Sequence, residues 1–181
     1  SRLDEIFWQR LQQMECRVML EEIDPVGGKA KAEAVLKSLA ITQKEPANVI
    51  YIGDSITDAE ALRFVKENGG LAVSFNGNRY CVSHADIACI TEDTTVTSIL
   101  IDCFDKHKKA GVIELVENHW NPEGFREFHL DPSLIEKFEV LLSQSKHLNA
   151  SVISDSNREV LIEESETMRK HIRGLAIGNL G

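Results

Sequence analysis

The sequence contains no long apolar run, and this absence argues against a membrane span. A transmembrane helix needs about 20 consecutive apolar residues, and no segment of the 181-residue chain approaches that length. The first residues, Ser1 to Glu5, lack the basic start and the apolar stretch of a secretory signal. We therefore expect a cytoplasmic protein that does not enter a membrane.

Basic residues are also scarce. The chain has 20 Lys and Arg against 29 Asp and Glu, which gives a net charge of −9. Nucleic-acid-binding surfaces require clustered positive charge, and the longest basic cluster, Lys106 to Lys109, fits the charged end of a helix. The composition therefore predicts no nucleic-acid partner.

Paired metal ligands of the zinc type are missing as well. The four cysteines, at positions 16, 81, 89 and 103, form no Cys-x-x-Cys pair, and the six histidines are scattered along the chain. Structural zinc sites use closely spaced ligand pairs. We expect reduced thiols, as in cytosolic proteins, and no zinc site.

What the sequence does have is a regular alternation of helical and strand patterns. Short, almost wholly apolar runs are typical of strands covered on both faces, and the segments between them show helical spacing. Alternating strands and helices predict an α/β fold with a doubly wound, Rossmann-like parallel sheet. The expected strands are 49–52, 71–75 and 87–90, and the expected helices are 29–40, 57–68, 79–84 and one that starts near 94.

The segments on either side of this α/β region have a different pattern. Residues 1–22 show an apolar stripe with helical spacing. Residues 109–181 predict an α-helical C-terminal extension with helices near 111–120, 132–145 and 157–173. Within it, Ser151–Asn157 comes closest to a strand that enters an acidic loop, but Asp155 is better explained as the cap of the following helix. The sequence thus divides into a helix over 1–22, an α/β region over 23–108 and an extension over 109–181.

The strongest candidate site follows the strand expected at 49–52. A glycine, Gly53, ends the apolar run, and Asp54 and Asp58 follow it four residues apart. Ligands of open α/β sheets bind at the carboxyl ends of the strands, and carboxylate oxygens suit Mg²⁺. The alternative is that Asp54 caps the next helix and Asp58 favours its positive end. Spacing alone leaves both interpretations open.

Three segments in order resemble the haloacid dehalogenase (HAD) superfamily. Gly53–Asp58 resembles its fourth motif, an acidic loop after a core strand, and Lys31–Val35 resembles the start of its third-motif helix. Ala72–Asn76 and Ala85–Ile87 resemble the segment that follows the acidic loop. The resemblance covers about residues 24–92. It points to the phosphatase branch and extends to archaeal members of unassigned role.

The resemblance implies a role for each matching residue. Asp54 would ligate Mg²⁺, and Asp58 would ligate the ion or orient a ligating water. Lys31, which lies 23 positions before Asp54, would offset charge on the phosphoryl group, with Lys29 as a second candidate. The resemblance also implies substrate contacts from Ser55 and Asn76. A capping role for Ser55 and a turn role for Asn76 stay open.

The family's nucleophile motif is absent from this chain. HAD phosphatases attack phosphate with the first Asp of an Asp-x-Asp motif near the N-terminus, and nothing before Lys31 matches it. We therefore expect the C-terminal half of a HAD-type core, part of a Mg²⁺-dependent phosphohydrolase acting on a small phosphorylated metabolite. The chain alone would be inactive, and its partner would be the missing N-terminal half or, in a homodimer, a second copy.

Two other functions fit the same pattern. The first is a non-catalytic, HAD-like interaction module that binds a protein partner or itself. The second is a response-regulator receiver, which also combines acidic residues with a lysine. We rank the receiver lower because its acidic residues precede its lysine, whereas here Lys31 precedes Asp54.

Overall fold

The computed structural model describes residues 27–178, together with residues 5, 6, 10 and 14, and side chains up to Gly174. The helix predicted over residues 1–22 lies almost wholly outside the described residues. Among the described residues, no helix combines the length and the apolar character needed to cross a bilayer. The three cysteines in this part of the chain, Cys81, Cys89 and Cys103, are buried and form no disulfide among the described residues.

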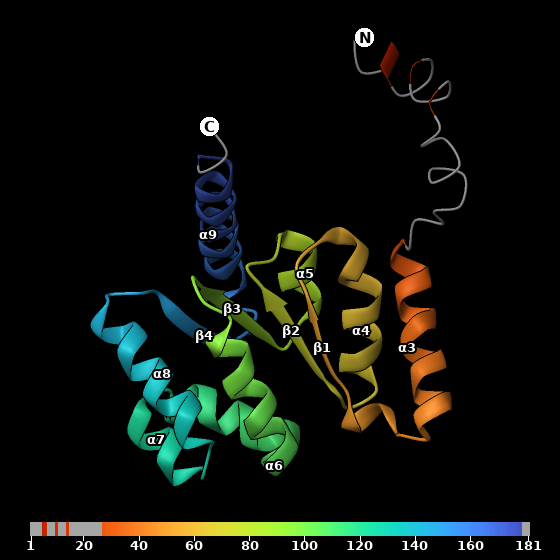
Figure 1. Cartoon of the computed structure of the whole chain (residues 1–181). Coiled ribbons are helices and arrows are strands. Elements are labelled where there is room, and N and C mark those ends of the chain that lie inside the picture. The colour runs from red at the N-terminus through yellow and green to blue at the C-terminus, as the bar shows by residue number, and fades with distance from the viewer. Residues whose placement is uncertain (1–4, 7–9, 11–13, 15–26, 179–181) are drawn as a thin grey trace.

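The described chain is an α/β structure built on a four-stranded, mostly parallel sheet (Figure 1). The strands lie side by side in chain order, which places β1 at one edge. The first three run parallel, with Ile52 of β1 opposite Val73 of β2 and Val73 opposite Ile87 of β3. The fourth pairs antiparallel with the third. The strands are β1 (Ile50–Gly53), β2 (Leu71–Phe75), β3 (Ile87–Thr91) and β4 (Leu148–Val152).

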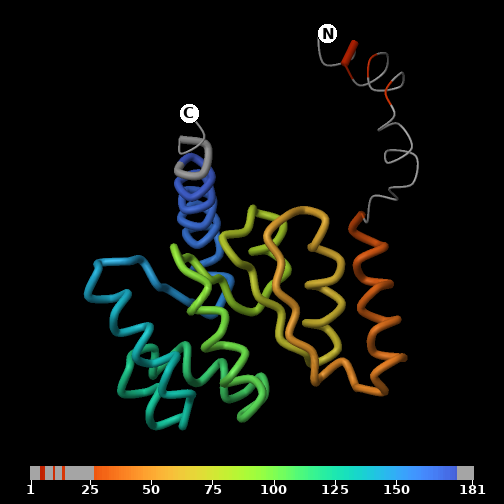
Figure 2. Tube along the Cα trace, viewed as in Figure 1, coloured from red at the N-terminus to blue at the C-terminus, as the bar shows by residue number. Residues whose placement is uncertain are grey.

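Helices connect and cover these strands. Figure 2 follows the chain from the orange α3, through the green α6, to the blue α9, which packs against α5 and β3. The helices are α3 (Gly28–Thr42), α4 (Ala59–Glu67), α5 (Arg79–His84), α6 (Thr95–Asn118), α7 (Pro122–Glu127), α8 (Pro132–Ser143) and α9 (Arg158–Gly178), with short 3₁₀ turns η3 (Pro46–Asn48) and η4 (Ile56–Asp58).

Side chains that alternate along the strands form an apolar core on each face of the sheet. Leu71, Val73 and Cys89 pack on one face against α6, α7 and α8. Ala72, Ala88 and Ile90 lie in the clusters of the other face, where α4, α5 and α9 contribute most of the other buried side chains. Because both faces are covered, the strands can be apolar throughout, which is why the sequence located β2 and β3 correctly.

The segment after residue 109 differs from its prediction as a purely helical extension. Residues 148–152 form β4, so the extension completes the sheet. Leu148 and Ala150 are buried in the main core, whereas Asn149 and Ser151, which alternate with them along the strand, are partly exposed. The strand is short and half polar, which hides the apolar run by which buried strands are recognised.

Helix α6 also differs from expectation, because it joins two segments predicted to be separate helices. It runs from Thr95 to Asn118 across a kink at Lys108, whose φ of 58° and ψ of −170° are not helical. After the kink, Val112 and Leu115 return to the same apolar cluster as Ile99 and Leu100. The kink therefore lets one face of the helix stay in the core along its length.

Helices α7 and α8 should contribute to the stability of the whole fold, because a cluster of aromatic side chains packs them into the main core beside the sheet. Phe125 is fully buried, with its ring centroid 4.9 Å from that of Phe138 and 5.1 Å from that of Trp120. Phe125→Ala should lower the free energy of unfolding by about 3–5 kcal/mol, measured by urea denaturation. As a control, Leu142→Ala alters an exposed side chain of α8 and should cost far less. If both variants lowered the free energy of unfolding by the same small amount, α7 and α8 would not be an integral part of the fold.

Candidate functional site

The loop after β1 is organised around the carboxylate of Asp58. Its Oδ1 accepts hydrogen bonds from Lys31 Nζ at 2.7 Å and from the Tyr51 hydroxyl at 3.0 Å. Its Oδ2 accepts from the backbone N–H groups of Asp54 at 3.2 Å and Ser55 at 3.0 Å, and from Ser55 Oγ at 2.9 Å. One buried carboxylate thus joins α3, β1 and the acidic loop.

The glycine that precedes the acidic pair is required by this packing. A Cβ atom at Gly53 would lie 2.5 Å from Asp58 Cβ and 2.9 Å from its Cγ. No relaxed structure permits such contacts, so only glycine lets the strand end this close to the Asp58 side chain. The Gly53-to-Asp58 spacing of the sequence is therefore a geometric requirement of the loop.

The hydrogen bonds to Asp58 keep it ionised. Burial by itself raises the pKa of this carboxyl, but donation from Lys31, Ser55 and Tyr51 outweighs burial and lowers the pKa from 3.8 to about 2. Burial and the neighbouring Asp58 carboxylate raise the pKa of Tyr51, so its hydroxyl remains a donor. Since both oxygens of Asp58 already accept several bonds, the predicted role of orienting a ligating water fits it better than direct ligation.

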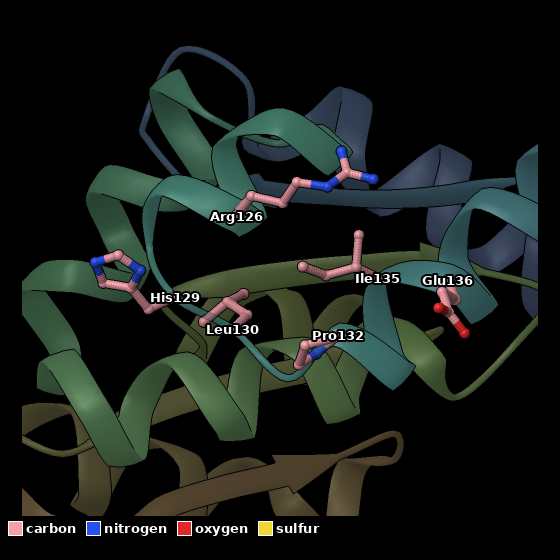
Figure 3. Close-up of a pocket in the computed structure, with 6 residues that line it drawn as sticks. All are labelled: Arg126, His129, Leu130, Pro132, Ile135 and Glu136. Atoms are coloured by element: carbon pink, nitrogen blue, oxygen red, sulfur yellow. The ribbon is translucent and has the colours of Figure 1, made fainter.

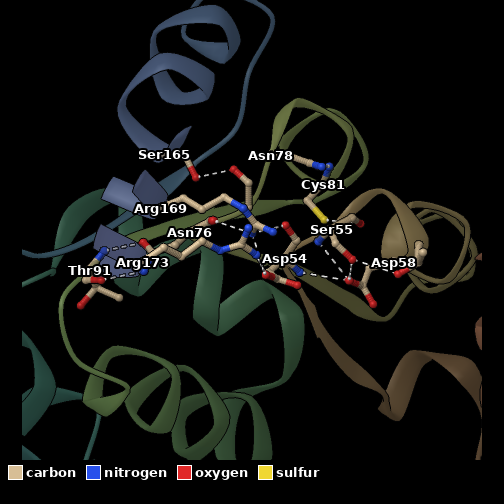
Figure 4. A network of polar contacts seen from close by, with 12 residues as sticks. Asp54, Ser55, Asp58, Asn76, Asn78, Cys81, Thr91, Ser165, Arg169 and Arg173 are labelled. Atoms are coloured by element: carbon tan, nitrogen blue, oxygen red, sulfur yellow. Dashed lines mark hydrogen bonds and ion pairs between the residues drawn. The ribbon is translucent and has the colours of Figure 1, made fainter. Parts of the chain in front are cut away.

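Asp54 presents its carboxylate in a different direction, toward α9 (Figure 4). Arg169 Nη1 donates to Asp54 Oδ2 at 2.6 Å, to the Asp54 carbonyl at 2.6 Å and to the Asn76 carbonyl at 3.2 Å. Arg173 Nη2 lies 3.6 Å from Asp54 Oδ2. The Asp54 side chain is nevertheless 49% exposed, so it remains accessible to a ligand.

The predicted substrate residue Asn76 has its side chain committed elsewhere. Its Nδ2 donates to the Thr91 carbonyl at 2.8 Å, and its Oδ1 accepts from the Thr91 N–H at 3.0 Å. Its φ of 44° is left-handed, a conformation that asparagine tolerates better than most residues. These features favour the turn interpretation, and only the Asn76 main-chain carbonyl faces the site.

The structure therefore brings together four of the five predicted site residues: Lys31, Asp54, Ser55 and Asp58. The second lysine candidate, Lys29, is 84% exposed and lies 4.0 Å from Glu33 on the outer side of α3.

Sequence reasoning did not identify Tyr51, Arg169 or Arg173 as part of the site. Tyr51 was hidden inside an apolar run. The two arginines, four residues apart, share one helix face, but no local signal links that face to a loop 115 residues earlier.

The donor set fits one kind of metal site. Mg²⁺ is often held by one or two carboxylates, with waters and substrate phosphate completing its shell, and Asp54 offers such a carboxylate. Among the described residues, no group of three or more His, Cys, Asp or Glu side chains could hold a metal ion. At this loop the described residues therefore offer one accessible carboxylate, that of Asp54, which is paired with Arg169, and they do not form a complete metal site by themselves.

A separate pocket lies away from this network, on α7, α8 and the segment between them (Figure 3). It measures about 490 Å³ and is lined by Arg126, His129, Leu130, Pro132, Ile135 and Glu136. Arg126 already pairs with Glu139 at 2.6 Å. This pocket contains neither the acidic loop nor Lys31, so the polar network at β1 remains the better candidate site.

Acid titration should reveal the Asp58 carboxylate in the stability of the protein. Because its pKa is about 2 in the folded state against an ordinary 3.8, ionised Asp58 contributes about 2 kcal/mol. This contribution is complete above about pH 4 and is lost as the pH falls toward 2. Urea denaturation should show wild type more stable than Asp58→Asn at pH 7, with the difference shrinking below about pH 4.

The exposed Asp155→Asn variant provides the control for this titration, since the Asp155 side chain is 94% exposed. It should follow wild type across the same pH range. A stability difference between wild type and Asp58→Asn that does not change with pH would contradict the assigned role of the carboxylate.

Comparison with known proteins supports the fold but no family. No family model matches the chain, and no curated protein matches it. Among solved structures, the gene product AF1437 from Archaeoglobus fulgidus is similar, with a TM-score of 0.64 and 22% sequence identity. The similarity covers 97% of this chain and 48% of that protein. The chain thus has the fold of about half of a longer archaeal protein.

Proposed function

We propose that this chain is the C-terminal part of the catalytic core of a Mg²⁺-dependent, HAD-type phosphohydrolase that acts on a small phosphomonoester. One observation carries the proposal: the Lys31–Asp58 ion pair, 27 residues apart in sequence, lies at the carboxyl end of β1 beside Asp54. The resemblance to the HAD superfamily predicts that Lys31, from the third motif, lies beside Asp54 and Asp58, from the fourth motif.

The parts of this site have separable roles. Asp58 holds the loop through the backbone N–H groups of Asp54 and Ser55, which leaves the Asp54 carboxylate available as a metal ligand. Lys31 places positive charge at the strand end, where it would offset the charge of a transferring phosphoryl group. Bound Mg²⁺ would supply further charge stabilisation. These groups would position the substrate and neutralise the charge of its phosphoryl group. The attacking nucleophile would come from outside this chain.

The layered architecture supports the finer fold assignment. The sheet has parallel β1, β2 and β3 and carries helices on both faces, as in doubly wound, Rossmann-like proteins. An antiparallel edge strand such as β4 is common in sheets of this kind.

The open edge of β1 supports the proposal that the core continues beyond this chain. Among the described residues, β1 has a strand neighbour on one side only, and Ile50, Tyr51 and Ile52 are only partly buried. A groove of about 520 Å³ runs beside it, lined partly by Ile50, Ile101 and Phe104. We propose that the missing part adds a parallel strand there and supplies the nucleophilic aspartate.

In the assembled enzyme the nucleophilic carboxylate would attack phosphorus and expel the alcohol of the substrate. Water would then hydrolyse the resulting aspartyl-phosphate and release inorganic phosphate. Asp54 would stay beside the phosphoryl group in both steps.

The metal role of Asp54 can be tested on the chain as it is. Titration calorimetry should detect weak Mg²⁺ binding, and Asp54→Asn should abolish it because the metal loses its carboxylate ligand. The matched control Asp155→Asn removes an exposed carboxylate and should leave binding unchanged. Mg²⁺ binding that survives Asp54→Asn would contradict the metal assignment.

The absence of a nucleophile makes a further prediction. The chain of residues 1–181 should not hydrolyse p-nitrophenyl phosphate in the presence of Mg²⁺. Clear turnover by this chain that is lost in Asp54→Ala would show that the nucleophile lies within it, and would overturn the proposal of a missing half.

The second candidate function is a non-catalytic interaction module, favoured by the same open edge. An unpaired strand edge can receive a strand of another chain, and Ile101 beside it is 45% exposed. If the edge pairs two copies, sedimentation should show a dimer that Ile101→Asp dissociates. An Asp-x-Asp motif encoded upstream of Ser1 would favour the enzyme over this module.

A further inference from the structure

A small pocket lies between the acidic loop and α9. It measures about 110 Å³ and is lined by Asp54, Phe75, Asn76, Arg169, Ile172 and Arg173. One buried water needs roughly 10–15 Å³ by the corresponding measure, so the pocket has room for a small oxyanion. The lining combines polar groups at the ends of β1 and β2 with two arginines from a helix far along the chain.

Arg169 is fixed but not saturated. Its side chain is 16% exposed, and all three of its hydrogen bonds are made by Nη1. Within the described part of the chain, its Nη2 and Nε donate no hydrogen bond to another residue. A guanidinium has five N–H donors, so Arg169 retains capacity for an acceptor in the pocket.

Arg173 is held much more loosely. Its side chain is 63% exposed, and its 3.6 Å approach to Asp54 Oδ2 is longer than a good hydrogen bond. An exposed ion pair of this kind contributes little. Arg173 can therefore turn toward an anion in the pocket without losing a strong contact.

The charges around the pocket favour an anion. Arg169 and Arg173 bring two positive charges to the single carboxylate of Asp54, while Lys31 and Asp58 neutralise each other. A Mg²⁺ ion at Asp54 would add two further positive charges. A multiply charged anion in the same pocket would offset them, so the two ligands should favour each other's binding.

We propose that this pocket is a phosphoryl-binding subsite in which Arg173 and Arg169 bind the oxyanion and Asp54 binds Mg²⁺ beside it. The proposal rests on the proposed function, because it names the residues of that site that recognise the substrate phosphate. Planar, bidentate donation makes arginine well suited to phosphate oxygens. The contact of both arginines with Asp54 is then the arrangement of the site without its ligands.

The test titrates the chain with inorganic phosphate and follows binding by calorimetry. Arg173→Gln should weaken phosphate binding about 5- to 10-fold, since the variant loses a charge-assisted hydrogen bond to the oxyanion that solvent exposure partly screens. Arg169→Gln should have at least the same effect. Lys170→Gln is the matched control, because it removes one positive charge from an exposed position of the same helix and should change affinity less than about 2-fold.

Mg²⁺ provides the second arm of the experiment. Saturating Mg²⁺ should tighten phosphate binding to wild type about 5-fold or more and should leave binding to Asp54→Asn unchanged. Phosphate binding that depends on Arg173 but not on Mg²⁺ supports the subsite and contradicts the metal role in the proposed function.

Two results would overturn the subsite itself. The first is that the wild-type chain does not bind inorganic phosphate. The other is phosphate affinity that is the same in Arg173→Gln, Arg169→Gln and Lys170→Gln. If Mg²⁺ binding that depends on Asp54 persists in either case, the proposed function stands, and the substrate phosphate binds outside this pocket.

Discussion

The site depends on one buried carboxylate, that of Asp58. A buried charge is costly unless hydrogen bonds replace its lost hydration, and here Lys31, Tyr51, Ser55 and the Asp54 N–H supply them. These donors come from a helix, a strand and the loop between strand and helix. The need to satisfy Asp58 therefore ties both α3 and β1 to the acidic loop that carries Asp54.

A second constraint comes from the far end of the chain. The antiparallel strand β4 completes the sheet next to β3, and α9 then packs against β3 and α5. From there Arg169 reaches the main-chain carbonyls of Asp54 and Asn76. The region that shows no motif in the sequence thus closes the pocket over the acidic loop and gives it an excess of positive charge.

The sequence predicted those parts of the structure that have local signals. The buried strands β2 and β3 are continuous apolar runs, and the convergence of Lys31 with Asp58 followed from two spaced motifs. Strand β4 was not predicted because Asn149 and Ser151 interrupt its apolar pattern. Arg169 was not predicted because its partner Asp54 lies 115 residues away, and such a contact is decided by topology rather than by local sequence.

The central claim is that Asp54 presents its carboxylate to a divalent cation at the end of β1 while the Lys31–Asp58 pair stays intact. Anomalous diffraction from crystals grown with Mn²⁺ and phosphate tests it most directly. The account predicts a Mn²⁺ peak in coordination distance of an Asp54 carboxylate oxygen, with phosphate oxygens between the metal and Arg173. A metal peak away from Asp54, or none, would contradict it.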